Sequence, residues 1–406
     1  MKLVIFVLPL FLISFATSDI TRANNLFATS LYKNLVEGDK NEAFSPFSLH
    51  TILALTYEGS AGVTENHLKT ALTLPSKLDT ATSYNALLTK LARKSNVTFD
   101  VANKIYAKIG YTFAKSFQEA AVNDFLAETG SVNFENGNAA ANEINGWVNT
   151  KTNGKIPTLV SGSDFNKYTR AILLNALYFK GKWEAKFNAK ETATLPFYVN
   201  ERETVNCSMM RRLDAFYYSK NNELDAQLLK MKFQDDRFSL IVILPNSRTG
   251  ITRLEQSLKN INVDELTDRF SVGDVSVSLP RFKIESSYKL KDALSKVGLT
   301  DIFDDSAEFP DILNEERTLQ VSEVFHKATI EINEEGGEAT AASGVVISVP
   351  LSSHYVPPPP IAFKADHPFV FLLTADMGQT RFGTFADSII VLMGKVTRPE
   401  IVNQKI

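Results

Sequence analysis

The side chains best suited to chemistry in this sequence are five histidines and one cysteine. The histidines are His50, His67, His326, His354 and His367. None has metal-ligand spacing, and Cys207 has no second cysteine to complete a site. The chain also has no G-x-S-x-G turn and no phosphate-binding glycine loop. We therefore expect no metal and no cofactor. A serine–histidine–aspartate triad assembled by folding stays open only as the alternative of an unrelated enzyme.

The most informative spacing lies in residues 333–353, which read NEEGGEATAASGVVISVPLSS. Residues 336–344 are almost all small, and no proline interrupts residues 336–349. Alternate residues from Gly337 to Ile347 would share one face of a strand, and that face is small or apolar. A proline would remove a hydrogen-bond donor from a central strand, so its absence is significant. The pattern predicts a loop that can insert into a β-sheet.

The elements that must position this loop follow from hydrophobic periodicity. Helical patterns dominate the first half, near residues 27–35, 49–58, 65–72, 83–93, 114–127 and 139–152, with one more at 290–297. Strand patterns dominate after residue 165, at 170–179, 238–244, 275–284, 324–334, 369–373 and 389–393. The pattern at 275–284 has Pro280 near its middle. Helices followed by strands predict an α+β fold in a single domain.

In the 324–334 pattern, His326 shares the inner face with apolar residues. A hydrogen-bonded core histidine is therefore the favoured interpretation over a catalytic one.

The first 18 residues are typical of a secretory signal peptide. Lys2 precedes an apolar run that ends in Ala16-Thr17-Ser18, and the run is too short for a membrane span. We place the mature start near Asp19 and expect a secreted, soluble domain over residues 19–406. Removing Lys2 changes the formal charge from -3 to -4, which gives no reason to expect nucleic-acid or membrane partners.

Three further features are the glycosylation sequons, the single cysteine and a cluster of basic residues. Asn96 and Asn206 begin N-x-S/T sequons and are candidate glycosylation sites, Asn96 the more credible because Cys207 and a strand pattern adjoin the other. Cys207 cannot form an intrachain disulfide, so packing must stabilise the fold. Lys90, Arg93 and Lys94 lie together, either as a solvated face or as a weak site for a polyanion such as heparin.

Several short motifs occur in order along the chain. They are FSPFSL at 44–49, INGWV at 144–148, TNGKI at 152–156, NALYFKGKW at 175–183, ILPN at 243–246, LPRF at 279–282 and FKADHPFVF at 363–371. With the insertable loop and the four prolines at 357–360, they make the chain similar to the serpins, a family of serine protease inhibitors. The resemblance covers nearly all of residues 19–406 and is closest to secreted, inhibitory arthropod members.

The resemblance implies an α+β serpin fold with three β-sheets, about nine helices and an exposed reactive-centre loop at about 336–362. It implies a monomeric inhibitor that is consumed in a single reaction with its target serine protease. The cut loop inserts into the main sheet and traps the protease as a covalent acyl-enzyme. It places Trp183 beneath the point where the loop enters, called the breach. It places four residues at the mid-sheet shutter: Ser45, Ser48, Asn175 and His326.

The resemblance also assigns a hinge at the start of the loop. Its residues are Glu334, Glu335, Gly336, Gly337, Glu338, Ala339, Thr340, Ala341, Ala342 and Ser343. Gly337 stands where the family prefers threonine or serine, and its flexibility costs roughly 0.5–1 kcal/mol in a strand. The remaining hinge is small and uncharged on its inner face, as insertion requires. A non-inhibitory serpin, acting as a carrier, storage protein or chaperone, is the alternative.

The scissile bond is predicted between Leu351 and Ser352. Val349-Pro350-Leu351-Ser352 resembles the Ile-Pro-Met-Ser at the cut site of an inhibitory serpin. The rival positions are Val349, Pro350, His354 and Tyr355. Residues 338–363 contain no lysine or arginine, so a protease with a carboxylate in its specificity pocket would find no partner. We expect a chymotrypsin- or elastase-like target. Clotting, melanisation, immunity and digestion all stay open as pathways.

Overall fold

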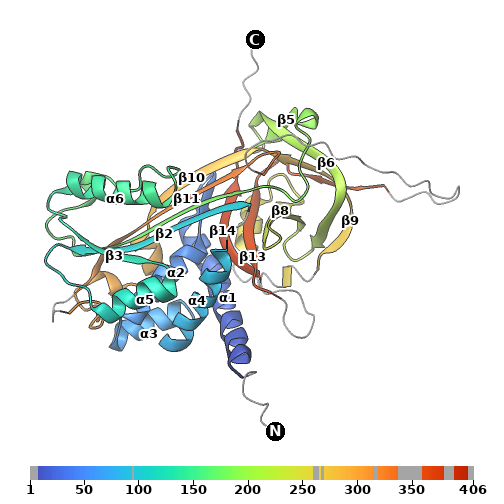
Figure 1. Cartoon of the computed structure of the whole chain (residues 1–406). Helices are drawn as coiled ribbons and strands as arrows, with labels where there is room; N and C mark the ends of the chain where they lie inside the picture. The colour runs from blue at the N-terminus through green and yellow to red at the C-terminus, as the bar shows by residue number, and fades with distance from the viewer. Residues whose placement is uncertain are drawn as a thin grey trace, which may run out of the picture.

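A computed structural model describes residues 8–93, 96–258, 265–266, 269–314, 319–336, 359–378 and 388–400. Side chains of the first helix are described from Ile20 onward. In these residues eight α-helices and two hydrogen-bonded sheets form one mixed α+β body (Figure 1). The α+β fold predicted from the sequence is confirmed.

Seven of the eight described helices correspond to predicted periodic segments, whereas α7 was not predicted. They are α1 (Leu8–Leu35), α2 (Pro46–Glu58), α3 (Gly62–Ala71), α4 (Lys77–Leu91), α5 (Lys115–Phe125), α6 (Gly137–Lys151), α7 (Ile251–Ser257) and α9 (Lys291–Lys296). Helix α2 begins earlier than its apolar pattern because the Ser45 side chain accepts a hydrogen bond from the Ser48 N–H and proline follows directly. Gly298 has a φ of +100°, a conformation that ends α9 readily only with glycine.

The first sheet has five strands in the order β10-β11-β4-β2-β3. They are β10 (Phe282–Lys289), β11 (Val321–Ile332), β4 (Ala171–Gly181), β2 (Val97–Lys108) and β3 (Glu128–Val132). Strands β11 and β4 run parallel, whereas β10–β11 and β4–β2 are antiparallel. The centre of this sheet is therefore a parallel pair with an antiparallel neighbour on each side.

The second hydrogen-bonded sheet has nine strands. They are β1 (Glu42–Phe44), β14 (Ser388–Val396), β13 (Phe369–Asp376), β8 (Phe238–Pro245), β7 (Ala226–Lys232), β6 (Thr204–Asn221), β9 (Ser271–Pro280), β12 (Ile361–Lys364) and β5 (Ala193–Tyr198). Its two parts meet where the end of the long strand β6 pairs with β7. The three expected sheets thus correspond to the five-stranded sheet and the two parts that β6 connects.

The pattern at 275–284 forms two strands rather than one. Strand β9 ends at Pro280, which pairs with Met209 of β6, and β10 begins at Phe282, which pairs with Ile332 of β11. Proline has no N–H with which to continue a ladder. The chain therefore leaves one sheet at Pro280 and joins the other, with Arg281 at the crossing.

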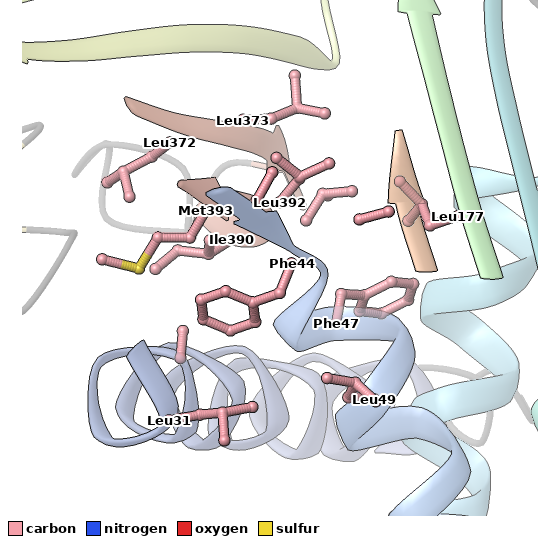
Figure 2. Close-up of a cluster of buried hydrophobic side chains, with 14 of the residues drawn as sticks. Leu31, Phe44, Phe47, Leu49, Leu177, Leu372, Leu373, Ile390, Leu392 and Met393 are labelled. Carbon is pink, nitrogen blue, oxygen red and sulfur yellow. The ribbon is translucent and has the colours of Figure 1, made fainter. Parts of the chain in front are cut away.

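Strand β4, at the centre of the five-stranded sheet, is buried on both faces, which explains its long apolar run. On one face, Leu177 packs into the large core with Phe47 of α2 and residues of β13 and β14 (Figure 2). On the other face, α6 covers the sheet through Ile144 and Val148, which cluster with Leu174 and Ala176 respectively (Figure 1). The strands therefore lie between two apolar layers.

Helix α1 extends past the predicted leader boundary. A cut before Asp19 would fall inside it, and its described side chains from Ile20 onward include the core residues Phe27 and Leu31. Among the helices described, none combines the length and apolarity of a membrane span. In the same residues no three metal-ligating side chains gather into a cluster.

Candidate functional site

The site is centred on the line along which the neighbouring strands β4 and β11 are hydrogen-bonded, which we call the seam. Nine residue pairs form its parallel register, from Val321–Ala171 to Ile330–Phe179, with one irregularity near Glu323. His326 and Asn175 are partners at the middle of this register. A strand that entered the seam would separate each of these pairs.

At one end of the seam, β11 turns into the segment that carries the predicted loop. The N–H of Gly336 donates to the carbonyl of Asn333 at 3.0 Å and closes the turn. Gly336 has a φ of +74°, and a Cβ there would lie 2.4 Å from the Gly181 carbonyl oxygen at the end of β4. Only glycine fits this close approach, so the hinge backbone is held against the neighbouring strand.

Trp183, predicted to lie beneath the point where the loop enters, contacts the hinge directly. Its indole Nε1 donates to the Asn333 carbonyl at 2.8 Å, and its backbone N–H donates to the Glu335 carbonyl at 2.9 Å. The ring is 1% exposed and stacks on Phe233 with centroids 4.4 Å apart. Because the stacked ring is fixed, both hydrogen bonds hold the hinge in one position.

Two hinge carboxylates add charged contacts. Glu334 is 5% exposed; its Oε1 accepts from Arg281 Nε at 2.7 Å and from the Thr192 hydroxyl at 2.5 Å. Burial alone would raise the pKa of Glu334, but these hydrogen bonds outweigh burial and lower the pKa. Glu335 pairs with Lys186. The hinge is therefore held by ion pairs as well as by backbone hydrogen bonds.

A row of buried polar side chains crosses the middle of the sheet. Asn175 Oδ1 accepts from the Ser48 hydroxyl at 2.8 Å and faces His326 Nδ1 at 2.5 Å. The Asn175 amide nitrogen donates to Asn103 Oδ1 of β2 at 2.5 Å. Ser45 joins the row through its backbone N–H, which donates to His326 Nε2 at 2.9 Å. All four predicted mid-sheet residues thus meet in one network.

The partners of His326 determine its tautomer. The Ser45 N–H can only donate, so Nε2 must be the acceptor and Nδ1 carries the proton that faces Asn175 Oδ1. The ring is fully buried, and burial lowers the pKa of His326 to about 3. The histidine is therefore neutral at physiological pH and acts as a structural hydrogen-bonding group.

Helix α6 and the segment after it cover the outer face of the seam. Phe325 of β11 and Leu174 of β4 belong to the same apolar cluster as Ile144 of α6. Lys327 of β11 donates from Nζ to the Thr158 carbonyl at 3.1 Å, in the segment that leads from α6 toward β4. The seam is thus fastened on its outer side as well as at the hinge.

The family profile described as Serpin (serine protease inhibitor) matches residues 22–399. The chain belongs to the serpin family. It is 35% identical over 362 residues to antichymotrypsin-2 of Bombyx mori, with 88% of this chain and 95% of that protein covered. It is 33% identical over 365 residues to leukocyte elastase inhibitor A of Rattus norvegicus, with 87% and 95% covered. The fold is similar to the crystal structure of Serpin48 of Tenebrio molitor, with a TM-score of 0.81, 32% identity and 94% and 98% coverage.

Part of the predicted site of this serpin lies outside the described residues. This part comprises Gly337, Glu338, Ala339, Thr340, Ala341, Ala342 and Ser343 of the hinge, and Val349, Pro350, Leu351, Ser352, His354 and Tyr355 around the cut. These assignments stay predictions. The structure describes the start of the hinge through Gly336 and the strand that follows the loop, β12.

The predicted surface features are placed as follows. Asn96 and Asn206 are both exposed, and glycosylation at either stays a prediction. Cys207 is fully buried, and burial raises the pKa of its thiol to about 11, so it is an inert core residue. The carbonyls of Lys90 and Arg93 accept from the guanidinium of Arg237. Lys94 lies outside the described residues, and polyanion binding stays a prediction.

Among the residues that the structure describes, the geometry gives no support to a hydrolytic triad. Within the described part of the chain, no histidine receives a hydrogen bond from a serine hydroxyl. Two histidines pair with an aspartate: His67 Nδ1 faces Asp301 Oδ1 at 2.9 Å. The other is His367, whose Nδ1 faces Asp366 Oδ1 at 2.7 Å. Its Nε2 faces the Pro245 carbonyl at 2.8 Å rather than a nucleophile. The pair therefore fastens the segment after β12 to the end of β8.

Sequence reasoning did not assign four residues that contact the site: Asn103, Thr192, Arg281 and Lys327. Each meets its partner across a large sequence separation, such as 142 residues between Thr192 and Glu334. Arg281 lies in the LPRF motif, but nothing local indicates that it binds the hinge. Asn103 alone had a signal, because a polar residue inside an apolar strand requires a buried partner.

Proposed function

We propose that this serpin is a secreted, single-use inhibitor of a chymotrypsin- or elastase-like serine endopeptidase. The observation that carries the proposal is the parallel pair β4–β11 at the centre of the main sheet, with β11 leading straight into the hinge. Cleavage of the loop would free its first part to enter the seam while the protease is attached to it as an acyl-enzyme.

The strand directions favour such an insertion. A segment that follows β11 through a tight turn must run antiparallel to β11, and it would therefore also run antiparallel to β4. One parallel ladder would be replaced by two antiparallel ladders, which are slightly more stable per residue. The small residues at 337, 339, 341 and 343 would enter on one face without burying a charge.

The contacts at the hinge and seam explain why the uncut molecule can stay in the five-stranded form. Insertion must release the Asn333 and Glu335 carbonyls from Trp183, and it must separate His326 from Asn175. It must also free Lys327 from the Thr158 carbonyl. These contacts oppose insertion until cleavage removes the tether at the far end of the loop.

The proposed target class is supported by the loop composition and by the relatives. Residues 338–363 contain no lysine or arginine, so a trypsin-like pocket would bury its carboxylate without a partner. Two similar proteins carry the names antichymotrypsin-2 and leukocyte elastase inhibitor A. Leu351 is the proposed residue before the cut, because an apolar side chain suits both kinds of pocket.

Secretion is proposed from the leader-like residues 1–18. A cut before Asp19 would leave in place the α1 contacts that begin at Ile20. The single buried cysteine means that the fold needs no disulfide in an oxidising compartment.

The inhibitory proposal is tested by incubating the purified protein with chymotrypsin, pancreatic elastase and trypsin. We expect an SDS-stable complex with chymotrypsin or elastase, and we expect mass spectrometry of the released peptide to place the cut at Leu351–Ser352. Cleavage by all three enzymes without any covalent adduct, and without a large rise in melting temperature, would refute the trap.

A non-inhibitory serpin is the second candidate, and Gly337 is the observation that favours it. The family prefers threonine or serine there, and glycine costs about 0.5–1 kcal/mol in a strand. Replacing Gly337 with threonine separates the two candidates. If the natural protein is a weak inhibitor that mostly behaves as a substrate, Gly337→Thr should increase the fraction of trapped protease, whereas a dedicated carrier should form no adduct in either version.

A further inference from the structure

A small hollow lies beside the hinge, between β6, β7 and the segment that follows β4. Its volume is about 60 Å³. At roughly 10–15 Å³ per water-sized position, this is room for about four to six such positions. The residues that matter for its chemistry are Trp183, Glu184, Arg212, Tyr217, Lys230 and Lys232. The hollow is therefore too small for a hormone-sized ligand, but it matches a tetrahedral ion.

Cations dominate the charged lining of the hollow. Arg212, Lys230 and Lys232 contribute three positive charges, and Glu184 contributes the one carboxylate. The Arg212 and Lys230 side chains are only 16% and 13% exposed. Two positive groups are thus largely removed from water at the wall of one cavity, an arrangement that attracts an anion.

The existing partners of these cations leave donors available. Arg212 contacts the Ala185 carbonyl and Asp214, which engage two of the five N–H groups of a guanidinium. Lys230 lies 3.8 Å from Asp376, beyond hydrogen-bond distance. Lys232 Nζ lies over the Tyr217 ring, 5.2 Å from its centroid. Asp214 and Asp376 are not among the lining residues. They partly neutralise Arg212 and Lys230 from outside and leave the hollow itself free for an anion.

We propose that this hollow binds a small oxyanion of the sulfate or phosphate class. Lys230 and Lys232 would donate from their ammonium groups, and Arg212 would donate from its remaining guanidinium N–H groups. Donor-only side chains suit an oxyanion, which has acceptors on every side. Burial lowers the pKa of Arg212, and the nearby carboxylate of Glu184 only partly offsets this effect.

The position of the hollow connects it to the hinge. Trp183 forms part of its wall and holds the carbonyls of Asn333 and Glu335. The backbone N–H of Phe187, another lining residue, donates to the Glu334 carbonyl at 3.0 Å. An anion bound here would stabilise the 183–187 segment and with it the closed hinge. A ligand that binds this form alone stabilises it in proportion to its occupancy.

The test uses Trp183 as a reporter. Trp147 and Trp183 are the only two tryptophans, so Trp147→Phe isolates the signal. Inorganic phosphate is titrated at constant ionic strength, and a saturable change in fluorescence is expected. The double variant Lys230→Gln with Lys232→Gln should bind phosphate at least tenfold more weakly, because each substitution removes one charged hydrogen-bonding group. Lys232→Arg should retain binding, which guards against a variant that has merely lost its fold.

The matched control is Lys220→Gln with Lys283→Gln, which removes the same charge from two exposed lysines outside the lining. It should bind phosphate as the parent does. A second titration with a sulfated disaccharide distinguishes a free ion from a sulfate ester on a glycan; tighter binding that needs Lys230 and Lys232 identifies the glycan. An equal response of the lining variant and the control, or the absence of saturation, overturns the proposal whether or not the protein inhibits a protease.

Discussion

Replacing Asn175 with alanine is the sharpest test of the mid-sheet network. The Asn175 side chain is fully buried and serves three partners: Ser48, His326 and Asn103. Each buried group left without a partner costs about 1–3 kcal/mol. A water in the vacated space would keep the total toward the lower end, so we expect a loss of about 3–5 kcal/mol in the free energy of unfolding.

The expected loss converts into a measurable shift. At roughly 2 cal/mol/K per residue, a chain of this length has an unfolding entropy of about 0.8 kcal/mol/K, so the midpoint should fall by about 4–6 °C. The assay is far-ultraviolet circular dichroism of uncut protein, with parent and variant heated at one scan rate because unfolding of a chain of this size is commonly irreversible.

The matched control is Thr329→Val. Thr329 lies on β11, is 1% exposed, and its hydroxyl has no hydrogen-bond partner within the described residues. Valine has nearly the same shape, so this change should leave the midpoint within about 1 °C or raise it slightly, since no hydrogen bond is lost. A midpoint for Asn175→Ala that is no lower than that of Thr329→Val would refute the reasoning.

The Asn175→Ala variant also tests insertion. In loop-cleaved protein with the seam open, the bond between Asn175 and His326 is already broken. Asn175→Ala should therefore lower the midpoint of cleaved protein by less than it lowers that of uncut protein. Equal losses in the two forms would mean that cleavage does not open the seam.

Three further predictions concern the loop and pH. Ala341→Arg should convert inhibitor to substrate because a charge must enter the sheet, whereas Thr340→Arg, on the other face, should lower the trapped fraction less; gel quantification of adduct against cleaved product decides. Leu351→Arg should shift inhibition toward trypsin, and an unchanged preference would place the cut elsewhere. In the His326→Gln variant, the free energy of unfolding should decrease less steeply as pH falls. With the folded pKa lowered to about 3, the unfolded state binds the extra proton below about pH 6.5, so stability falls as pH falls, by up to about 1.4 kcal/mol per pH unit. Urea midpoints at two pH values should show this change, and an equally steep loss of stability in His326→Gln would contradict it.

Local pattern identified most of the helices and the most apolar strands, but it predicted no strand at β2 or at the long β6. Apolar runs such as 238–244 identified strands buried on both faces, and periodic segments identified every described helix except α7. The largest boundary error was in α1, which begins at Leu8 rather than near residue 27. Helix α4, capped by Ser76, begins six residues before its predicted start at 83. The segment at 275–284 was mistaken for a single strand because periodicity cannot show that Pro280 and Phe282 belong to different sheets.

The candidate site was likewise predicted only in part from the sequence. The motifs indicated which residues would gather at the hinge and mid-sheet, but only the three-dimensional structure shows their partners. Arg281 and Glu334 are 53 residues apart, and Asn103 and Asn175 are 72 apart. Pairings of this kind depend on strand order and register, which a linear pattern does not contain. The scissile bond lies outside the described residues and stays a prediction from sequence alone.

If this serpin inhibits a protease by the proposed loop insertion, the contacts at the seam must meet two opposing requirements. Apolar layers on both faces stabilise the sheet whether or not a strand is added, so they cannot decide between the two forms. The difference in stability between the two forms would then depend on polar contacts that only the uninserted form makes. These are Trp183 with the hinge carbonyls, Asn175 with His326, and Lys327 with the Thr158 carbonyl. If these contacts were much weaker, the uncut loop would insert and the inhibitor would be lost. If they were much stronger, the protease would hydrolyse the acyl-enzyme before the loop could move. The proposed oxyanion site lies beside one of these contacts, where a small change in binding would act on that balance.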